Sequence, residues 1–210
     1  MSDRQRNRPI RLDSTQQRLF DALKTRGIDG RSVLEIGCGT GGLHHRLLAE
    51  GAASVTGVEL QTDYLAKAEA HARELGHADR TTYLKGDFMK LADRIEPADI
   101  VILDKVVHCY HDPEGLIRCS TAHTRSLYAI AFPANRPLLR ASLHLLSPLL
   151  RLVLPFRVRF SPPETIREWI RRNGFERVYR HDSDTWHTEI YTRRRDPEES
   201  ESDLGARPPT

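Results

Sequence analysis

A carboxylate, a thiol and four glycines stand close together near residue 35, in a pattern suited to binding a small charged ligand. Residues 31–42 read Arg-Ser-Val-Leu-Glu-Ile-Gly-Cys-Gly-Thr-Gly-Gly. The apolar residues of this segment are typical of a strand buried on both faces of a parallel sheet. The glycines allow a tight turn, and Leu43, Leu47 and Leu48 predict a following helix whose free N–H groups face a ligand. Strand, turn and helix predict the nucleotide-binding half of a doubly wound fold.

The carboxylate of Glu35 distinguishes between two classes of ligand for this turn. Gly37, Gly39 and Gly42 satisfy the dinucleotide pattern G-x-G-x-x-G, which is weak support by itself. A carboxylate two residues before the first glycine repels a pyrophosphate and attracts a cation. S-adenosylmethionine carries an ammonium and a sulfonium group and no phosphate, so Glu35 favours this ligand. The alternative is a Rossmann-like glycine turn that binds another molecule, or none.

The pattern Glu-x-Gly-x-Gly-x-Gly resembles motif I of the class I S-adenosylmethionine-dependent methyltransferases. The resemblance covers about residues 30–193 and is strongest for the small-molecule enzymes near the magnesium-protoporphyrin and quinone O-methyltransferases. It implies S-adenosyl-L-methionine as cofactor and S-adenosyl-L-homocysteine as product. The fold class it implies is α/β, a Rossmann-like doubly wound sheet. Such a sheet is mostly parallel and seven-stranded, with an antiparallel last strand and helices on both faces.

Further candidate cofactor residues follow the predicted strands. Glu59 ends a strand about 20 residues after the turn, where an acid normally binds ribose hydroxyls, and both interpretations of the fold predict it. The resemblance implies that Leu60 flanks the ribose, that Asp87 accepts from the adenine amine and that Phe88 packs on the ring. An N-cap role for Asp87 is the alternative. The full set of expected cofactor residues is Glu35, Gly37, Cys38, Gly39, Gly41, Glu59, Leu60, Gly86, Asp87, Phe88 and Asp104.

The loop after the predicted strand 97–104 carries the candidate catalytic residues. Asp104 stands at the carboxyl end of this strand, where ligands of open α/β sheets bind. Methyl transfer requires an acceptor held about 3 to 3.5 Å from the methyl carbon. An alcohol or phenol must also lose a proton, which a histidine near neutral pKa can take. We therefore predict His108 and His111 as the general-base candidates, the alternative being that both face solvent or bond the backbone.

The same loop excludes several related chemistries. Enzymes that methylate nucleic-acid amino groups carry Asn/Asp-Pro-Pro-aromatic here, whereas residues 104–107 read Asp-Lys-Val-Val. The Pro-Cys nucleophile of cytosine-C5 enzymes and the further Asp/Asn ligands of catechol-type enzymes are also missing from this loop. The four polar side chains between His108 and Asp112 are too close along the chain to surround one ion easily, so no metal site is expected.

Hydrophobic periodicity and turn signals predict the remaining elements. Ser14, Asp112 and Ser161 are expected to be helix N-caps. The adjacent His44 and His45 point about 100° apart and are expected on the surface of their helix. We expect strands at 31–36, 54–60, 81–84, 97–104, 125–132, 175–181 and 185–192, and helices at 15–26, 43–50, 63–75, from 113 and from 162.

The chain divides into one domain with polar ends. We expect a flexible basic arm over 1–13, a single methyltransferase domain over 14–193 and a disordered tail over 194–210. Within the domain, 135–160 is a hydrophobic helical insert whose 135–154 part is apolar nearly all round. It fits a core helix, a lid over an oily substrate, or an interfacial helix making peripheral membrane contact.

Composition limits location and partners. The 210 residues carry a formal net charge of +3 with 29% charged residues, a balance that argues against nucleic acid as partner. Three cysteines without disulfide-type or metal-type spacing are typical of a reducing compartment, so we expect a cytoplasmic protein. The N-terminus lacks a signal-peptide core, and no apolar run reaches the roughly 18 residues of a membrane span. The expected partner is a small-molecule acceptor, with the protein a monomer or homodimer.

The sequence therefore predicts methyl transfer from S-adenosylmethionine to a small, hydrophobic or aromatic molecule, on oxygen before other atoms. Methylation of nitrogen or carbon, and a non-catalytic S-adenosylmethionine-binding protein, remain alternatives. A nicotinamide-dependent reductase is disfavoured by Glu35 and by the lack of a Tyr-x-x-x-Lys proton donor.

Overall fold

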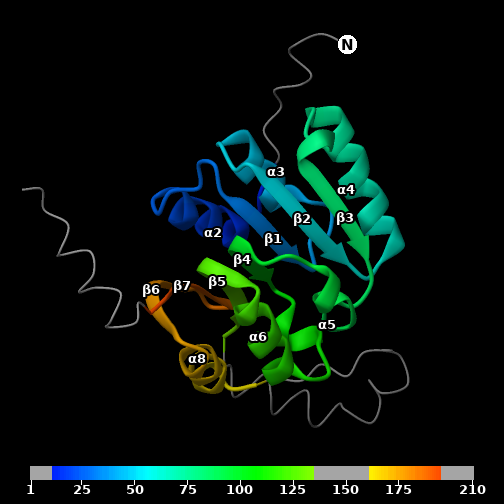
Figure 1. The fold of residues 1–210 in the computed structure, drawn as a ribbon. Coiled ribbons are helices and arrows are strands. Elements are labelled where there is room, and N and C mark those ends of the chain that lie inside the picture. The colour runs from blue at the N-terminus through cyan, green and yellow to red at the C-terminus, as the bar shows by residue number, and fades with distance from the viewer. Residues whose placement is uncertain (1–10, 135–160, 195–210) are drawn as a thin grey trace, which may run out of the picture.

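Seven strands form a single twisted sheet in the computed structural model, which describes residues 11–134 and 161–194 (Figure 1). The strand order is β3-β2-β1-β4-β5-β7-β6. Neighbours from β3 to β5 are parallel, whereas β7 runs antiparallel between β5 and β6. The strands are β1 (Ser32–Ile36), β2 (Ser54–Glu59), β3 (Thr81–Lys85), β4 (Ala98–Asp104), β5 (Thr124–Pro133), β6 (Phe175–Asp182) and β7 (Trp186–Arg193). The predicted fold class, with its antiparallel last strand, is confirmed.

Helices cover both faces of the sheet (Figure 1). One face carries α2 (Ser14–Lys24), α3 (Gly42–Ala49) and α4 (Thr62–Leu75), and the other carries α5 (Phe88–Leu91), α6 (Pro113–Ala122) and α8 (Pro163–Arg172). In the described part of the chain, the connections contain the short 3-10 turns η1 (Ala78–Arg80), η2 (Ala92–Arg94) and η3 (Val107–Cys109). No helix among the described residues is long and apolar enough to cross a membrane.

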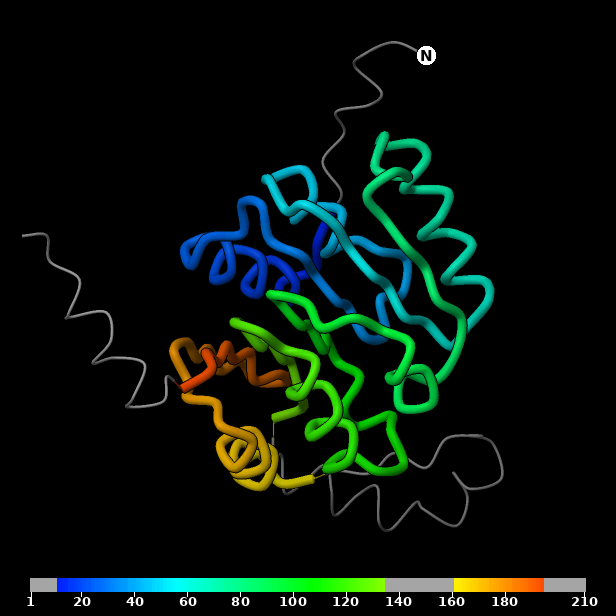
Figure 2. Tube along the Cα trace, in the orientation of Figure 1, coloured from blue at the N-terminus to red at the C-terminus, as the bar shows by residue number. Residues whose placement is uncertain are grey.

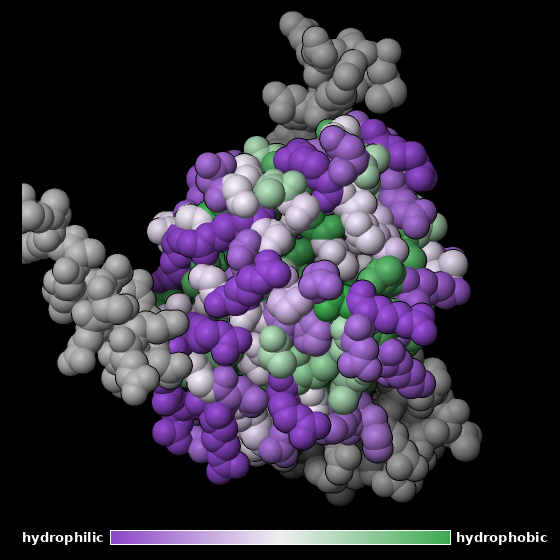
Figure 3. Space-filling model, viewed as in Figure 1, coloured by the Kyte–Doolittle hydropathy of each residue, from purple (hydrophilic) through white to green (hydrophobic). Residues whose placement is uncertain are grey.

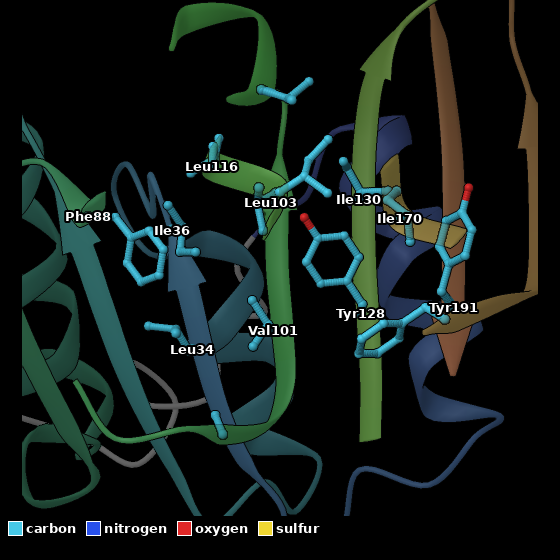
Figure 4. Close-up of a cluster of buried hydrophobic side chains, with 14 of the residues drawn as sticks. Leu34, Ile36, Phe88, Val101, Leu103, Leu116, Tyr128, Ile130, Ile170 and Tyr191 are labelled. Atoms are coloured by element: carbon cyan, nitrogen blue, oxygen red, sulfur yellow. The ribbon is translucent and has the colours of Figure 1, made fainter. Parts of the chain in front are cut away.

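The core consists of two layers because successive strand residues point to opposite faces. Leu34, Val101 and Tyr128 face the layer that contains α5, α6 and α8, and they pack there with Ile170 (Figure 4). Their chain neighbours, among them Val33, belong to the layer that contains α2 and α3. The central strands are apolar on both faces, and this is why they read as continuous hydrophobic runs in the sequence.

Two of the three predicted helix N-caps are wrong. Asp13, and not Ser14, caps α2, because its carboxylate accepts from the N–H groups of Thr15 (2.9 Å) and Gln16 (3.0 Å). The Gln16 side chain accepts in return from the Asp13 N–H, and this completes a capping box between the two residues. The predicted cap at Ser161 is also absent, since α8 follows Pro162 without any side-chain cap. Asp112 caps α6 through the Gly115 N–H (2.9 Å), as predicted.

Segments from opposite ends of the described chain lie side by side. Helix α2 packs on β7, and Figure 2 shows the backbone of both segments. The guanidinium of Arg26, just after the helix, donates to the Val178 carbonyl of β6 at 2.7 Å. Hydrophilic side chains cover most of the face in Figure 3, with small apolar areas between them. The predicted domain limits stay a prediction, and the hydrophobic insert at 135–160, most of the basic arm and most of the tail lie outside the described residues.

A buried ion pair joins α8 to the last strand. Glu189 of β7 has no exposed surface, and its carboxylate accepts from Arg167 Nε of α8 at 2.8 Å and from the Tyr191 hydroxyl. Arg167 also bonds Glu164, whose side chain is 83% exposed. One guanidinium is therefore shared between a buried and a solvated carboxylate.

Replacing Glu189 by alanine should destabilise the fold strongly. The change leaves Arg167 buried without its inner partner, so we expect the free energy of unfolding to fall by about 3 to 5 kcal/mol in chemical denaturation. Glu164→Ala is the matched control, because it removes a carboxylate from the same guanidinium at the surface, and it should cost far less. Equal losses in the two variants would contradict the argument from burial.

Candidate active site

Acidic residues end or follow three of four adjacent strands at one edge of the sheet, and the glycine turn follows the fourth. In the order β3-β2-β1-β4, this edge presents Asp87, Glu59, the glycine turn and Asp104. Figure 1 shows the arrowheads of β1, β2 and β3 directed toward this edge. Ligands of open α/β sheets bind outside the carboxyl ends of the strands. The topology therefore assembles most of the sequence-predicted cofactor residues at one place.

The turn after β1 requires glycine at two positions for different reasons. A Cβ on Gly37 would lie 2.3 Å from Val106 Cγ1, so a side chain there would clash with the loop after β4. Gly41 has φ +82°, and a Cβ on it would lie 2.6 Å from His44 Nε2. The turn therefore packs tightly against the β4 loop on one side and against imidazole rings on the other.

Glu59 ties the glycine turn to the end of β2. Its two carboxylate oxygens accept from the Gly39 N–H and the Gln61 N–H, both at 2.9 Å. Each oxygen keeps lone pairs for further donors, because a carboxylate has about four acceptor sites. The next residue, Leu60, is 60% exposed, which leaves an apolar surface beside this carboxylate. Both residues lie where the sequence placed a ribose contact.

The two residues expected to contact adenine, Asp87 and Phe88, differ in how well the structure agrees with that expectation. Asp87 caps α5 by accepting from the Met89 N–H at 3.0 Å, so the alternative N-cap role is present, and its place at the edge is as predicted. Phe88 differs from expectation, because its side chain is fully buried in the core beside Ile36 and offers no exposed face to a ring (Figure 4). Tyr110, from the loop after β4, approaches Asp87 instead, and burial together with that carboxylate raises its pKa.

Glu35 points away from the edge, into the layer of α3 and α4. In the sheet register Glu35 pairs with Gly57 and Gly57 pairs with Tyr83, so the three residues form one row on one face. Gly57 leaves space in this row, since a Cβ there would lie 3.0 Å from Tyr83 Cδ1 and 3.0 Å from Cys38 Sγ. The Glu35 carboxyl consequently meets His44 of α3, at 2.5 Å from Nδ1.

His44 and His45 are buried, and the prediction that they lie on a helix surface is wrong. Their exposed fractions are 0% and 1%. Both rings bond one hydroxyl, that of Tyr83, with His44 Nε2 at 2.9 Å and His45 Nε2 at 3.2 Å. His45 Nδ1 also lies 3.3 Å from His77 Nδ1. The two rings point in different directions, as expected for adjacent helix residues. Both are nevertheless buried, because α3 is enclosed by the sheet, α2 and α4.

Burial keeps this polar network uncharged. It raises the pKa of Glu35 to about 8 and lowers the pKa of His44 and of His45 to about 3. At neutral pH one proton is therefore shared between Glu35 and His44, and the pair is neutral overall. Glu35 remains a predicted cofactor residue, but its place beneath the turn makes it a support for the turn more than a source of negative charge.

The acidic group next to the turn on its other side is Asp104. Its side chain is 7% exposed, and its Oδ2 accepts from Gln16 Nε2 of α2 at 3.1 Å. Burial raises the pKa of Asp104 to about 6, which leaves it mostly ionised at neutral pH. Lys105, the next residue, has φ +59°, a left-handed conformation that is rare outside glycine and is found at functional sites.

The two candidate catalytic histidines differ in burial. His108 lies in η3, half-buried, with its ring 5.6 Å from the Trp186 ring of β7. Its Nδ1 atom is buried without a hydrogen-bond partner among the described residues. Burial lowers the pKa of His108, so the ring is neutral at pH 7 and able to accept a proton. His111 is exposed further along the same loop.

Neither the thiol of Cys38 nor the possible metal ligands among the described residues form a further site. Cys38 is buried in the turn, and burial raises the pKa of its thiol well above the usual range. Within the described ranges, no three His, Cys, Asp or Glu side chains are arranged to hold a metal ion.

Sequence reasoning missed four residues at or near this edge: Gln16, Tyr83, Tyr110 and Trp186. Gln16 and Trp186 reach the edge from elements far from it in sequence, and no local pattern marks either of them. Tyr83 could have been found, because period-two alternation places it on the face opposite Leu84 in β3.

Comparison with known proteins identifies the same part of the chain. A family model described as a methyltransferase domain matches residues 33–126. This range contains the glycine turn, Glu59, Asp87, Asp104 and His108.

Two relatives with similar sequences carry the same name. The ubiquinone biosynthesis O-methyltransferase of Actinobacillus pleuropneumoniae serotype 5b is 33% identical over 118 residues, which are 54% of this chain and 47% of that protein. The protein of the same name from Idiomarina loihiensis is 37% identical over 117 residues, which are 54% of this chain and 44% of that protein. The chain thus spans about half the length of the curated relatives it matches.

Solved structures extend the likeness to the whole fold. The magnesium protoporphyrin IX methyltransferase of Synechocystis PCC 6803, solved with bound S-adenosylhomocysteine, superposes with a TM-score of 0.68 at 20% identity. The superposition covers 86% of this chain and 82% of that chain. At this identity the likeness establishes the fold alone.

The buried histidines should make the fold sensitive to acid. His45 stays neutral in the folded protein to about pH 3, whereas an unfolded histidine binds a proton near pH 6.5. Stability should therefore fall as pH drops below about 6.5. In His45→Gln this fall should be shallower by at most about 1.4 kcal/mol per pH unit, reduced by solvent screening.

Denaturation at a series of pH values measures this slope. His181→Gln, on β6 and outside the network, is the control and should keep the native slope. A native-like slope in His45→Gln would show that the network does not titrate as described.

Proposed function

We propose, from the premise that residues 33–126 are a methyltransferase domain of the class I S-adenosylmethionine-dependent superfamily, that this protein methylates an oxygen of a small hydrophobic molecule. The methyl group comes from S-adenosylmethionine, and S-adenosylhomocysteine is the second product. The acceptor we favour is aromatic and carries a hydroxyl or carboxyl group.

The observation that carries the proposal is the acidic edge around the glycine turn. Asp87, Glu59 and Asp104 follow or end β3, β2 and β4, on both sides of the turn. Three carboxylates disfavour a pyrophosphate and favour a ligand with cationic groups and hydroxyl donors. This arrangement supports S-adenosylmethionine over a nicotinamide dinucleotide, and it replaces the charge argument first based on Glu35.

Each residue at the edge has a distinct part in the proposed site. Glu59 binds the ribose hydroxyls with the lone pairs that Gly39 and Gln61 leave free. Asp87 accepts from the adenine amine, with Leu60 as an apolar neighbour. S-adenosylmethionine supplies an electrophilic methyl group whose sulfonium charge disappears on transfer. The protein's own task is therefore to orient the acceptor and to exclude water.

The acceptor side has a neutral imidazole and aromatic rings. His108 is half-buried and lies against Trp186, while Lys105 Nζ lies 5.8 Å from the centre of the same indole ring. A neutral imidazole suits removal of a proton from a phenol or alcohol. The aromatic surroundings favour a flat, apolar acceptor. The named relatives act in ubiquinone biosynthesis as O-methyltransferases, which supports oxygen as the acceptor atom.

The non-enzymatic alternative is a protein that binds S-adenosylmethionine without catalysing a reaction. Incubating the protein with labelled S-adenosylmethionine and cell extract, then identifying the labelled product by mass spectrometry, decides between the two. Labelled product supports catalysis and identifies the acceptor. Cofactor binding without any labelled product from a complete extract favours the binding protein. The cytoplasmic location and the monomer or homodimer state stay predictions.

Calorimetry should show tight binding of S-adenosylhomocysteine and none of NAD. Glu59→Gln should weaken S-adenosylhomocysteine binding about tenfold or more, because an amide replaces a charged acceptor worth about 1.5 to 3 kcal/mol. Glu74→Gln makes the same change at an exposed site on α4 and should leave binding unchanged. Unchanged affinity in Glu59→Gln would remove Glu59 from the site, and tight NAD binding instead would overturn the cofactor assignment.

His108→Ala should lower kcat by about 10² to 10⁴ on a hydroxyl acceptor while cofactor affinity stays unchanged. His181→Ala, on β6, is the control and should keep the native rate. A small effect of His108→Ala would favour a carboxylate acceptor, which is already ionised at neutral pH and needs no base. Full activity of both His108→Ala and His111→Ala on a hydroxyl acceptor would contradict the general-base assignment.

A further inference from the structure

The first turn of α2 contacts the end of β4. Gln16 Nε2 donates to Asp104 Oδ2 at 3.1 Å across 88 residues of sequence. Lys105 Nζ lies 3.6 Å from the same oxygen and 2.5 Å from Asp13 Oδ2, at the N-cap of α2. One oxygen of Asp104 is therefore occupied by the protein, and the helix N-terminus is fixed to this edge of the sheet.

The other oxygen of Asp104 has no partner among the described residues. Oδ1 is buried, and the whole side chain is 7% exposed. A buried carboxylate oxygen without a donor destabilises the folded protein, so such an atom calls for an explanation. A bound donor with positive charge would remove this destabilisation.

The position of Asp104 identifies the donor. Strand β4 lies next to β1, and Val106 contacts the start of the glycine turn, where a Cβ on Gly37 would lie 2.3 Å from it. Glu59 and Asp87, the proposed nucleoside contacts, lie on the opposite side of the turn. The methionine end of the cofactor must therefore extend from the turn toward β4. Its ammonium group offers three N–H donors and a positive charge.

We infer that Asp104 binds the ammonium group of the cofactor's methionine portion through Oδ1, and that Gln16 is a positioning residue that orients Asp104 for this contact. The inference rests on the proposed function and adds α2 to the cofactor site. Asp104 touches the ligand, whereas Gln16 acts only through Asp104.

The amide of Gln16 suits this role because both of its ends are used. Its Oε1 accepts from the Asp13 N–H at 3.4 Å in the capping box, while its Nε2 donates to Asp104. Glutamate is a preferred residue at this position of a capping box. It would keep the oxygen that accepts from Asp13 but would lose the N–H donor to Asp104. Gln16→Glu therefore separates orientation of Asp104 from the stability of α2.

Ionisation of Asp104 gives an independent readout. The side chains that influence its ionisation are those of Lys105, Gln16 and Asp13, together with that of Glu35 of β1. Its pKa is about 6 because burial outweighs the lysine. A cation contact needs the ionised form, so the affinity for S-adenosylhomocysteine should fall as pH drops below about 6 and should be constant above it.

The test compares two ligands by calorimetry with the full chain. S-adenosylhomocysteine carries the ammonium group, whereas 5′-methylthioadenosine has the same nucleoside without the amino-acid portion. Asp104→Asn should weaken S-adenosylhomocysteine about tenfold or more and leave 5′-methylthioadenosine unchanged. Gln16→Glu should weaken S-adenosylhomocysteine in the same selective way at a native-like melting temperature.

Gln17→Glu is the matched control, because it introduces the same charge one residue along α2. Gln17 is exposed, and among the described residues its side chain bonds only Asp21, at 2.8 Å. This variant should bind both ligands as the native protein does. The loss of S-adenosylhomocysteine affinity below pH 6 should disappear in Asp104→Asn.

Equal weakening of both ligands in Asp104→Asn, or no weakening, would overturn the inference while leaving the proposed function intact. Selective weakening in Asp104→Asn with native behaviour of Gln16→Glu would overturn the role of Gln16. Failure of the native protein to bind either ligand would overturn the proposed function, and this inference with it.

Discussion

The buried row formed by Glu35, Gly57 and Tyr83 is the constraint on which the rest of the site depends. A carboxyl and a phenol inside a protein must find partners, because each unsatisfied polar group costs about 1 to 3 kcal/mol. Here the partners are His44 and His45 of α3, together with the Ala68 carbonyl of α4. Satisfying the row fixes both helices against the sheet. Because Gly41 rests on the two imidazoles, the row also fixes the turn above them.

The groups that support the glycine turn are different from the groups that carry negative charge at the sheet edge. Polar groups beneath the turn share protons and remain neutral, whereas carboxylates at the strand ends face the ligand side. A charged group without partners beneath the turn would be costly in the interior. At the strand ends, the side chains of Glu59 and Asp104 are also buried, but both accept hydrogen bonds from protein donors. The chain therefore places its negative charge at the ends of β2 and β4 and after β3, at the edge where we propose that the cofactor binds.

Much of the fold could be predicted, because apolar strands and helix periodicity are local signals. The limits of β2 and β4 differ from expectation by only one residue, and the mostly parallel sheet with its antiparallel last strand follows from the family resemblance. The burial of His44 and His45 could not be predicted, since it depends on α4 covering α3. The same holds for Gln16, which meets Asp104 only after 88 residues of chain have folded between them. Phe88 differs in the opposite way: the family motif assigned it to the ligand, whereas in the structure it is buried in the core.

The packing of α2 has a consequence for how the domain assembles. This helix is synthesised before every strand, yet it packs on β7 and donates from Arg26 to β6, which emerge last among the described elements. Contacts between such distant segments form late, because closing a long loop costs entropy before the contact repays it. A nascent chain that already contains the glycine turn, Glu59 and Asp104 therefore lacks the strands that hold α2 in place. Competence to bind a ligand should arise near the end of folding, as a property of the completed chain.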